Sequence, residues 1–311
     1  LNTTSVFFRY CIFRYKKRFP LLIFISEYII MDMLANKMDS LKCLSCGGNL
    51  LISKEFVKCS NCAAVYKKKD KTIFFTRSIA EKDNSAIYKI KDYLKKYPSV
   101  IILFYNTLGV FVGKKPKDII KNIPKDGSLI VDIASGVKTI RKDIVRVDTE
   151  SYEGVEVVAD ALNLPFKNDS CDLVICESSL EHFKDPILAV KEMNRVLKKE
   201  GLVYISVPFI VGFHASPNDY FRWTEAGVEE LMKDFEKIEL GVGWGPTYAL
   251  TSILREWMAI IFSFNSQKIY QILSLTFMFV FSPLNYLDYI FGRFKSANNI
   301  AYGFYYIGAK K

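Results

Sequence analysis

Histidine is nearly absent from this sequence, and acidic side chains are outnumbered. Only His182 and His214 occur among 311 residues, so few imidazoles are available for proton transfer near neutral pH. The 33 Asp and Glu face 43 Lys and Arg, a formal net charge of +10. Residues 1–126 hold 24 of the basic and 10 of the acidic side chains, a net of +14, and the remainder has a net of −4. We expect the basic part to meet nucleic acid or a lipid surface, or to present a solvated lysine-rich face.

A disulfide framework is also missing. Four of the seven cysteines form two C-x-x-C pairs twelve residues apart, a pattern that suits a reducing compartment and a metal site. Each turn offers two thiolates, and two turns complete a tetrahedral site. We predict a zinc ribbon over residues 39–78, with a structural Zn²⁺ because four protein ligands leave no open position. The predicted ligands are Cys43, Cys46, Cys59 and Cys62.

The first residues lack a convincing cleavage site. Residues 1–38 combine basic side chains with a short apolar run over 21–25, which is short for spanning a bilayer. The segment is either a signal or anchor, or it lies upstream of a true start at Met31 or Met38. We assign no function to it.

Further along, the sequence alternates between apolar runs and helical patterns. A helix is predicted over 85–98, and a second helix runs from 185 to a C-cap at Gly201. Strands joined by helices or short connections predict an α/β fold with a doubly wound parallel sheet. The predicted strands are 128–135, 143–149, 155–158, 171–177 and 202–209.

Acidic residues follow successive predicted strands, namely Asp132, Asp148, Asp160 and Glu177. Ligands of such sheets bind beyond the carboxyl ends of the strands, so we expect these acids to share one site. Carboxylates suit a neutral or cationic ligand that carries hydroxyls and amines. The acid after the second strand can accept both hydroxyls of a ribose.

Four segments carry a family resemblance. "LIVDIASG", "VRVDTE", "VVADALNLPFKNDSCDLVICESSLEHFKDP" and "VLKKEGLVYISVPF" resemble class I S-adenosylmethionine-dependent methyltransferases, most of all the ubiquinone- and menaquinone-biosynthesis-like branch with "LPF…LEH" segments. The resemblance implies a Rossmann-like seven-stranded sheet. Its core would cover residues 85–246, and residues 297–311 would supply a last, antiparallel strand.

The same resemblance implies a set of cofactor contacts. Ala134 stands where the family has its first loop glycine, and no third glycine follows. This departure indicates weakened cofactor binding or a degenerate, non-catalytic protein. The implied contacts are Asp132, Ala134 and Gly136 in the cofactor loop, Asp148 at the ribose, Asp160 and Ala161 at the adenine, and Glu177 and Ser178 at the methionine end.

A loop after the fifth strand resembles the acceptor-closing loop of this branch. It reads "FHASPNDYFRWTEAGVEELMKDF", and Thr224 is the expected N-cap of its helix. His214 and Asp219 join His182 as candidate catalytic bases, and Tyr220 and Arg222 are candidate substrate contacts. Alternatively, the loop is internally bonded and structural, and His182 only caps the helix that follows it.

Residues 247–295 form a hydrophobic insertion before the last strand. Residues 269–287 carry no charge, which is close to the length that spans a bilayer. Because the flanking strands must pair in one sheet, the chain has to return to the side it left. We therefore expect a membrane-associating pair of helices, with a soluble lid or dimer surface as the alternative.

These observations leave three functions open. The first is S-adenosylmethionine-dependent methyl transfer to a small-molecule, lipid or lipid-linked glycan acceptor at a membrane surface. The second is an RNA methyltransferase whose zinc ribbon binds RNA, and the third is a non-catalytic adaptor. For the first function we expect a cytoplasmic protein that is peripheral or monotopic at the cytoplasmic face of the membrane.

Overall fold

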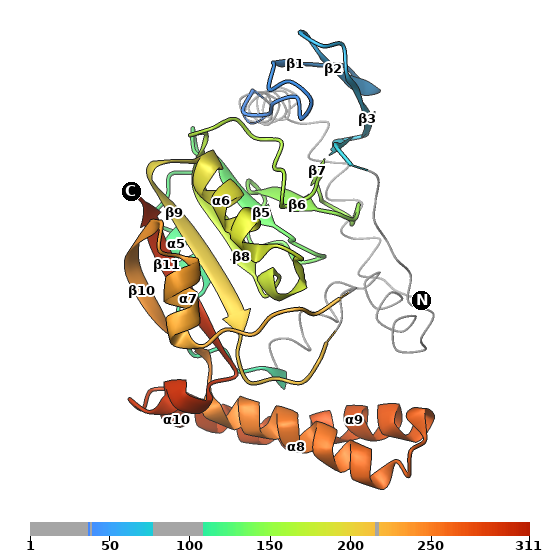
Figure 1. The fold of residues 1–311 in the computed structure, drawn as a ribbon, viewed down its shortest axis with the longest axis vertical. Helices are drawn as coiled ribbons and strands as arrows, with labels where there is room; N and C mark the ends of the chain where they lie inside the picture. The colour runs from blue at the N-terminus through green and yellow to red at the C-terminus, as the bar shows by residue number, and fades with distance from the viewer. Residues whose placement is uncertain (1–36, 38, 77–107, 215–217) are drawn as a thin grey trace, which may run out of the picture.

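The computed structural model describes residues 37, 39–76, 108–214 and 218–311. The predictions for the N-terminal segment and for a helix over 85–98 therefore fall on residues outside the described part of the chain. Within the described ranges, eleven strands form one continuous sheet in the order β1-β2-β3-β4-β7-β6-β5-β8-β9-β11-β10 (Figure 1).

Seven of these strands form the core of the sheet. Parallel pairing joins β7, β6, β5, β8 and β9, and β11 runs antiparallel to both β9 and β10. Numbered along the chain, the core has the order 3-2-1-4-5-7-6. The parallel sheet and the antiparallel last strand were both predicted and are confirmed. The core strands are β5 (Ile130–Ile133), β6 (Val145–Asp148), β7 (Val157–Val158), β8 (Cys171–Glu177), β9 (Leu197–Pro208), β10 (Phe235–Trp244) and β11 (Gly303–Lys310).

Helices cover both faces of the core because its strands are apolar on both sides. On one face, Met193 of α6 (Pro186–Val196) and Val228 of α7 (Glu225–Leu231) join the main buried cluster. On the other face, Ile120 of α5 (Pro116–Ile120) packs in the cluster that contains Tyr204. Thr224 caps α7 by accepting a 3.1 Å hydrogen bond from the Gly227 N–H, as predicted.

The end of helix α6 corrects one prediction. The helix stops at Val196, so Gly201 is not its C-cap. Leu197 instead begins β9 and pairs with Cys171 at the start of β8. A shift in register follows between Cys171 and Leu173, and Glu200 takes a positive φ of 63°. Pairing with the neighbouring strand thus replaces the last helical turn that the apolar spacing predicted.

The C-x-x-C region, residues 39–76, extends the same sheet and is called the ribbon below. Its strands are β1 (Leu50–Ile52), β2 (Phe56–Cys59), β3 (Val65–Lys69) and β4 (Thr72–Phe74). Each of these strands pairs antiparallel with the next one along the chain. Strand β4 then pairs parallel with β7, the edge strand of the core. The ribbon therefore shares its hydrogen-bond ladder with the core.

Helices α8 (Pro246–Phe262) and α9 (Gln267–Phe281) stand between β10 and β11 and form an antiparallel pair, called the hairpin below. The short helices η2 (Ser282–Leu287), α10 (Asp288–Phe291) and η3 (Ala297–Ile300) lead from it back to the sheet. The hairpin projects beyond the end of the sheet towards which β9 points (Figure 1). No helix in the described ranges is both long enough and apolar enough to cross a bilayer.

One buried carboxylate anchors the hairpin. Helix α8 begins after Gly245 without a side-chain cap of its own. Asp288, which is completely buried, accepts hydrogen bonds from the N–H groups of Thr247 at 2.8 Å and Tyr248 at 2.9 Å. A Cβ on Gly245 would collide with this carboxylate. Asp288 thus caps α8 from forty residues away and satisfies two N–H groups that the helix leaves open.

Candidate functional site

The candidate site lies at the carboxyl edge of the parallel strands. The neighbouring strands β5 and β8 mark the point where the strand order reverses, and such points hold the ligand in open α/β sheets. Asp132 lies in β5, Asp148 ends β6, and Glu177 ends β8. A separate cavity of about 270 Å³ opens at the amino edge beside Ser128 and Asp172, away from these acids.

Asp132 is the electrostatic centre of this edge. Its side chain is buried, with 4% of the residue exposed. Burial raises the pKa of Asp132 well above its usual range, and the nearby negative charges of Glu177 and Asp148 raise it further. Lys138 and Arg146 oppose this shift. A ligand that is cationic or donates hydrogen bonds would reduce the repulsion between these acids.

The loop after β5 is held close to the end of β6. Asp148 accepts hydrogen bonds from the N–H groups of Gly136 at 2.9 Å and Glu150 at 3.0 Å. Arg146, which is buried, donates to the Gly136 carbonyl at 2.5 Å and to the Glu153 carbonyl at 2.9 Å. The structure therefore brings Asp132, Gly136 and Asp148 together, as the sequence predicted.

Two non-glycine residues at this edge have left-handed backbone conformations. Ala134 has a φ of 53° and Ser178 a φ of 46°. Such conformations cost an ordinary residue about 1 kcal/mol or more. Ala134 occupies the position at which the resemblance predicts a glycine, and glycine adopts a left-handed conformation without strain.

Glu177 and Asp160 lie on opposite sides of Asp132 in the sheet order. Glu177 forms a 2.8 Å ion pair with Lys138. Asp160 follows β7 and accepts a 2.9 Å hydrogen bond from the Leu162 N–H, which closes a tight turn that includes Ala161. Both positions lie at the carboxyl edge of the sheet, where the sequence predicted the acids.

The ribbon supports the segment that carries Asp160. The Lys42 N–H donates to the Pro165 carbonyl at 2.9 Å, and the Lys167 N–H donates to the Ser40 carbonyl at 2.8 Å. Leu41 also pairs with Phe166 as an isolated bridge. The turn at Asp160 is therefore held from outside by the ribbon.

The ribbon gathers its four cysteines. The sulfurs of Cys43 and Cys62 are 3.6 Å apart, and those of Cys46 and Cys59 are 3.4 Å apart. All four lie within 4.8 Å of one another, which is close to the roughly 3.8 Å edge of a tetrahedron with 2.3 Å Zn–S bonds.

One of these thiols is prepared to ionise. Burial opposes the ionisation of Cys43, but hydrogen bonds from the Tyr66 hydroxyl and from the N–H groups of Cys46 and Ser45 lower the pKa of its thiol to about 6. A thiolate at neutral pH is the form that binds metal. The spacing of the four sulfurs therefore fits the predicted metal site, and Cys43 is the thiol most ready to ionise, since the pKa of Cys46 is raised to about 12.

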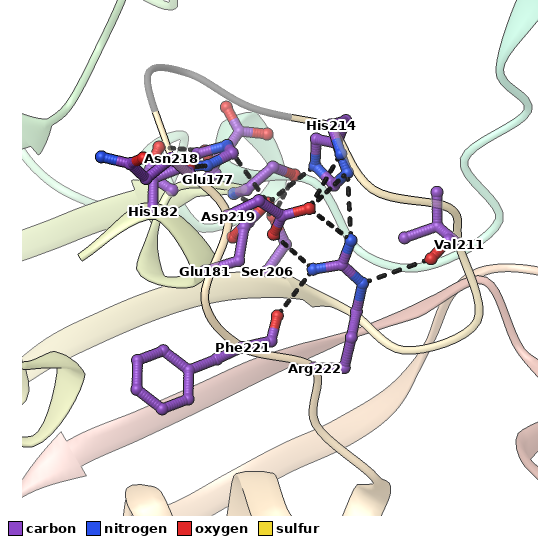
Figure 2. A network of polar contacts seen from close by, with 12 residues as sticks. Glu177, Glu181, His182, Ser206, Val211, His214, Asn218, Asp219, Phe221 and Arg222 are labelled. Carbon is purple, nitrogen blue, oxygen red and sulfur yellow. Dashed lines mark hydrogen bonds and ion pairs between the residues drawn. The ribbon is translucent and has the colours of Figure 1, made fainter. Parts of the chain in front are cut away.

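The loop after β9 brings the predicted acceptor residues together. Arg222 forms a two-pronged ion pair with Asp219, at 2.5 and 2.6 Å, and the His214 N–H donates to Asp219 at 2.8 Å (Figure 2). Burial opposes ionisation of Asp219, but the bonds from Arg222 and His214 lower the pKa of its carboxyl. Asp219 therefore organises the loop, and Tyr220 beside it is exposed.

Three residues at the site escaped sequence analysis. Lys138 lies in no motif and Arg146 had no role assigned within "VRVDTE", although both belong to the basic "KTIRKDIVR" stretch. Glu181 stood beside His182 in the "LEH" segment, yet spacing could not show what it faces. The structure places it against His214, which is 3.5 Å away at its Nε2 atom and is supplied by a distant loop (Figure 2).

Comparison with known sequences agrees with this geometry. Residues 130–205, which run from β5 into β9, match a family described as "Methyltransferase domain" (Methyltransf_11). The matched residues contain the acids of β5, β6 and β8, and the match supports the predicted class of enzyme core.

Two curated bacterial relatives resemble parts of the chain. An uncharacterized methyltransferase, YcgJ of Bacillus subtilis (strain 168), is 32% identical over 136 residues, which cover 42% of this chain and 46% of that protein. A demethylmenaquinone methyltransferase of Staphylococcus aureus (strain JH9) is 42% identical over 62 residues, or 20% of this chain and 26% of that protein. The chain thus spans less than half the length of these relatives.

Solved structures with a methyltransferase domain also resemble the chain. Phosphoethanolamine N-methyltransferase 2 of Haemonchus contortus, solved with phosphomonomethylethanolamine and S-adenosylhomocysteine, is 19% identical with a TM-score of 0.42, over 71% of this chain and 59% of that chain. A putative methyltransferase in complex with the Trm112 activator of Haloferax volcanii is 14% identical with a TM-score of 0.43, over 73% of this chain and 97% of that chain.

Proposed function

We propose that this protein transfers a methyl group from S-adenosylmethionine to a small-molecule, lipid or lipid-linked glycan acceptor at a membrane surface. The observation that carries the proposal is the buried Asp132 beside Asp148 and Glu177 at the carboxyl edge of a methyltransferase domain. These carboxylates complement a ligand that combines ribose hydroxyls, an amine and a positive sulfonium charge.

Each residue along this edge is positioned for a different part of the cofactor. Asp148 is positioned at the end of β6 for the ribose hydroxyls, and the turn at Asp160 and Ala161 for the adenine. Glu177 and Ser178 border the methionine end. When bound, the cofactor supplies an electrophilic methyl group, and the main task of the chain is to align the acceptor and exclude water.

The hairpin supports an apolar acceptor. Side chains at helical spacing on α8, namely Leu250, Ile253, Trp257, Ile260 and Ile261, are exposed. Helix α9 buries none of its residues, and its Ile272 is 64% exposed. Exposed apolar stripes of this size mark a membrane or interaction surface. The hairpin also lies beside the acceptor loop, since Gly212 faces the stem of Glu256 on α8.

One relative supports the same class of acceptor. The Staphylococcus aureus protein is named for demethylmenaquinone, an isoprenoid quinone. We therefore place a lipid-soluble acceptor ahead of RNA, and we place the protein at the cytoplasmic face of a membrane as a peripheral or monotopic enzyme. The ribbon, in this proposal, holds a structural Zn²⁺ through its four cysteines.

Calorimetric titration with S-adenosylmethionine tests the cofactor step. We expect Asp148→Asn to weaken binding at least tenfold, since it removes a charged acceptor from the ribose site. Glu230→Gln, a highly exposed carboxylate on α7, should bind like the parent. No heat of binding by the parent protein would leave the non-catalytic adaptor as the better function.

A labelled-methyl assay tests the acceptor. The full chain is incubated with labelled cofactor and with either a lipid extract or total RNA from the same cells. We expect label in the lipid fraction. Label confined to RNA, with binding that weakens steeply as salt rises, would replace the lipid proposal with the RNA methyltransferase.

A further inference from the structure

Glu181 is buried in a way that ordinary packing does not explain. It lies in η1 (Leu180–His182), directly after β8, and only 1% of the residue is exposed. Neither of its carboxylate oxygens has a hydrogen-bond partner in the part of the chain that the structure describes. A buried carboxylate without partners is among the costliest arrangements in a protein. It therefore indicates a missing positive partner.

Two imidazoles face this carboxylate, and they are the two histidines of the chain. His214 Nε2 lies 3.5 Å from Glu181 Oε1, and His182 Nε2 lies 3.9 Å from the same atom (Figure 2). These gaps exceed the roughly 2.7–2.9 Å of a charge-assisted hydrogen bond. They approach the roughly 3.4 Å that separates two ligands of one tetrahedral ion with bonds near 2.05 Å.

The second nitrogen of each ring is occupied by the protein. His182 Nδ1 lies 2.6 Å from the Asn218 carbonyl. His214 Nδ1 lies 3.2 Å from the Gly212 carbonyl, 3.3 Å from Arg222 Nη2 and 3.5 Å from Asp219. A proton on Nδ1 leaves the Nε2 lone pair free to bind a ligand, and for His214 this tautomer requires Nδ1 to donate to Gly212 and not to accept from Arg222. Metal-binding histidines are oriented by just this kind of outer hydrogen bond.

The Arg222–Asp219 pair completes the support. Asp219 receives both the Arg222 guanidinium and the His214 N–H, so its charge is already matched and it holds the His214 segment in place. Glu181 has no such match. The loop and η1 are also joined directly, because the Tyr220 N–H donates to the Glu181 carbonyl at 2.7 Å.

We propose that Glu181, His182 and His214 bind a divalent transition-metal ion beside the acceptor entrance. Two imidazole nitrogens and one carboxylate oxygen suit Zn²⁺ and its first-row neighbours. Three protein ligands leave coordination positions open, which is the pattern of a catalytic site and differs from the closed cysteine site of the ribbon. The two histidines are partly exposed, so the open side can face an incoming molecule.

The role of this ion rests on the proposed methyl transfer. The ion, held by Glu181, His182 and His214, would make a bound acceptor hydroxyl more acidic, so that its proton could pass to water. Its oxygen lone pair then forms the new C–O bond, while the C–S bond breaks and its electron pair stays on sulfur. In this proposal His182 and His214 would hold the metal, and neither would act as the general base.

Counting zinc per chain tests the site without any assay of activity. The full chain and its variants are equilibrated with Zn²⁺, freed of excess by gel filtration, and measured by elemental analysis. We expect Glu181→Gln and His214→Asn each to hold one zinc fewer per chain than the parent. Glu230→Gln serves as the matched control and should hold as much as the parent. The difference is informative whatever the ribbon binds.

Thermal melting of the same samples shows whether each variant is folded. Added Zn²⁺ should raise the Tm of chelator-treated parent protein more than that of the well-folded His214→Asn variant. Equal zinc content in the parent and both variants would overturn the proposal. So would a structure obtained with zinc in which Glu181 and His214 still pair directly, with no ion between them. Titration with S-adenosylmethionine is a separate readout, so failure of the cofactor proposal leaves the metal result interpretable.

Discussion

The ribbon and the hairpin are both attached to the same core, but they are attached by different means. The ribbon joins through backbone pairing, with β4 continuing the sheet at β7. The hairpin leaves and re-enters the sheet through β10 and β11, and its first helix is held by the Asp288 carboxylate. The ribbon is thus part of the sheet, whereas the hairpin is an appendage of it.

Their surfaces differ in the same sense. The apolar side chains Val57 and Ile73 of the ribbon are fully buried in the main core, although Leu51, Phe56 and Val65 of the ribbon are exposed. The hairpin instead exposes large apolar side chains, with Trp257 at 57% and Phe264 at 85%. The comparison teaches that the ribbon contributes buried side chains to the core, whereas α9 of the hairpin buries none of its residues and offers its apolar surface to a partner.

The largest effect is expected from breaking the ribbon. Cys59→Ser should abolish metal binding there, and structural zinc sites of this kind contribute on the order of 10 kcal/mol to the folding of their module. We expect loss of one zinc, a lower Tm, and weaker S-adenosylmethionine binding because the turn at Asp160 loses its support. Ser60→Ala, in the same turn, is the control. Unchanged cofactor affinity in a Cys59→Ser protein whose ribbon holds no zinc would contradict the idea that the ribbon supports the turn at Asp160.

The next effect concerns the exposed face of the hairpin. The double variant Trp257→Glu and Ile260→Glu should reduce binding to liposomes of anionic lipid by about 100-fold or more, because two large apolar side chains contribute roughly 3–6 kcal/mol to burial. Liposome flotation measures it. Ile187→Glu changes an equally exposed apolar residue on α6 and should bind like the parent. If the parent itself stays in the soluble fraction, the hairpin contacts a protein instead.

A smaller effect is expected at the anchor of the hairpin. Asp288→Ala leaves two N–H groups of α8 without a partner, which should lower the free energy of unfolding by about 1–3 kcal/mol. Urea denaturation measures it. Ser282→Ala, on the exposed hydrogen bond to Phe279, should change little. A loss as small as that of Ser282→Ala would show that other contacts hold the hairpin.

The smallest effect lies in the core that both attachments share. Ala134→Gly should raise the free energy of unfolding by about 1 kcal/mol, because glycine adopts the positive φ without strain. Ala189→Gly, inside helix α6, should lower it by a similar amount. Opposite signs for the two changes in urea denaturation are the expected result. A destabilising Ala134→Gly would mean that the methyl group packs usefully at the turn.

The sequence predicted the parts of the molecule that depend on neighbouring residues. The acids at strand ends, the cap at Thr224 and the spacing of the cysteines are local patterns, and each has the predicted place in the structure. The sequence could not predict pairing between distant segments. Nothing in the residues of β4 indicates β7 as a partner, and nothing in "LEH" indicates that Glu181 would face His214.

The failure at Gly201 has the same origin. The residues after Val196 fit a helix by spacing, yet Leu197 is taken by β8 as a pairing partner. Whether such a segment stays helical depends on what lies next to it, and that is a property of the fold. The roles of Lys138 and Arg146 were hidden for the same reason, because their partners lie in other loops of the site.

The pairing of β4 with β7 also has a consequence for how the chain can be divided. A strand as short as Val157–Val158 at an open edge would present unpaired N–H and C=O groups to other molecules. The ribbon covers that edge. A fragment that starts after residue 76 would lack this cover, and the N–H and C=O groups of β7 would have to find other partners.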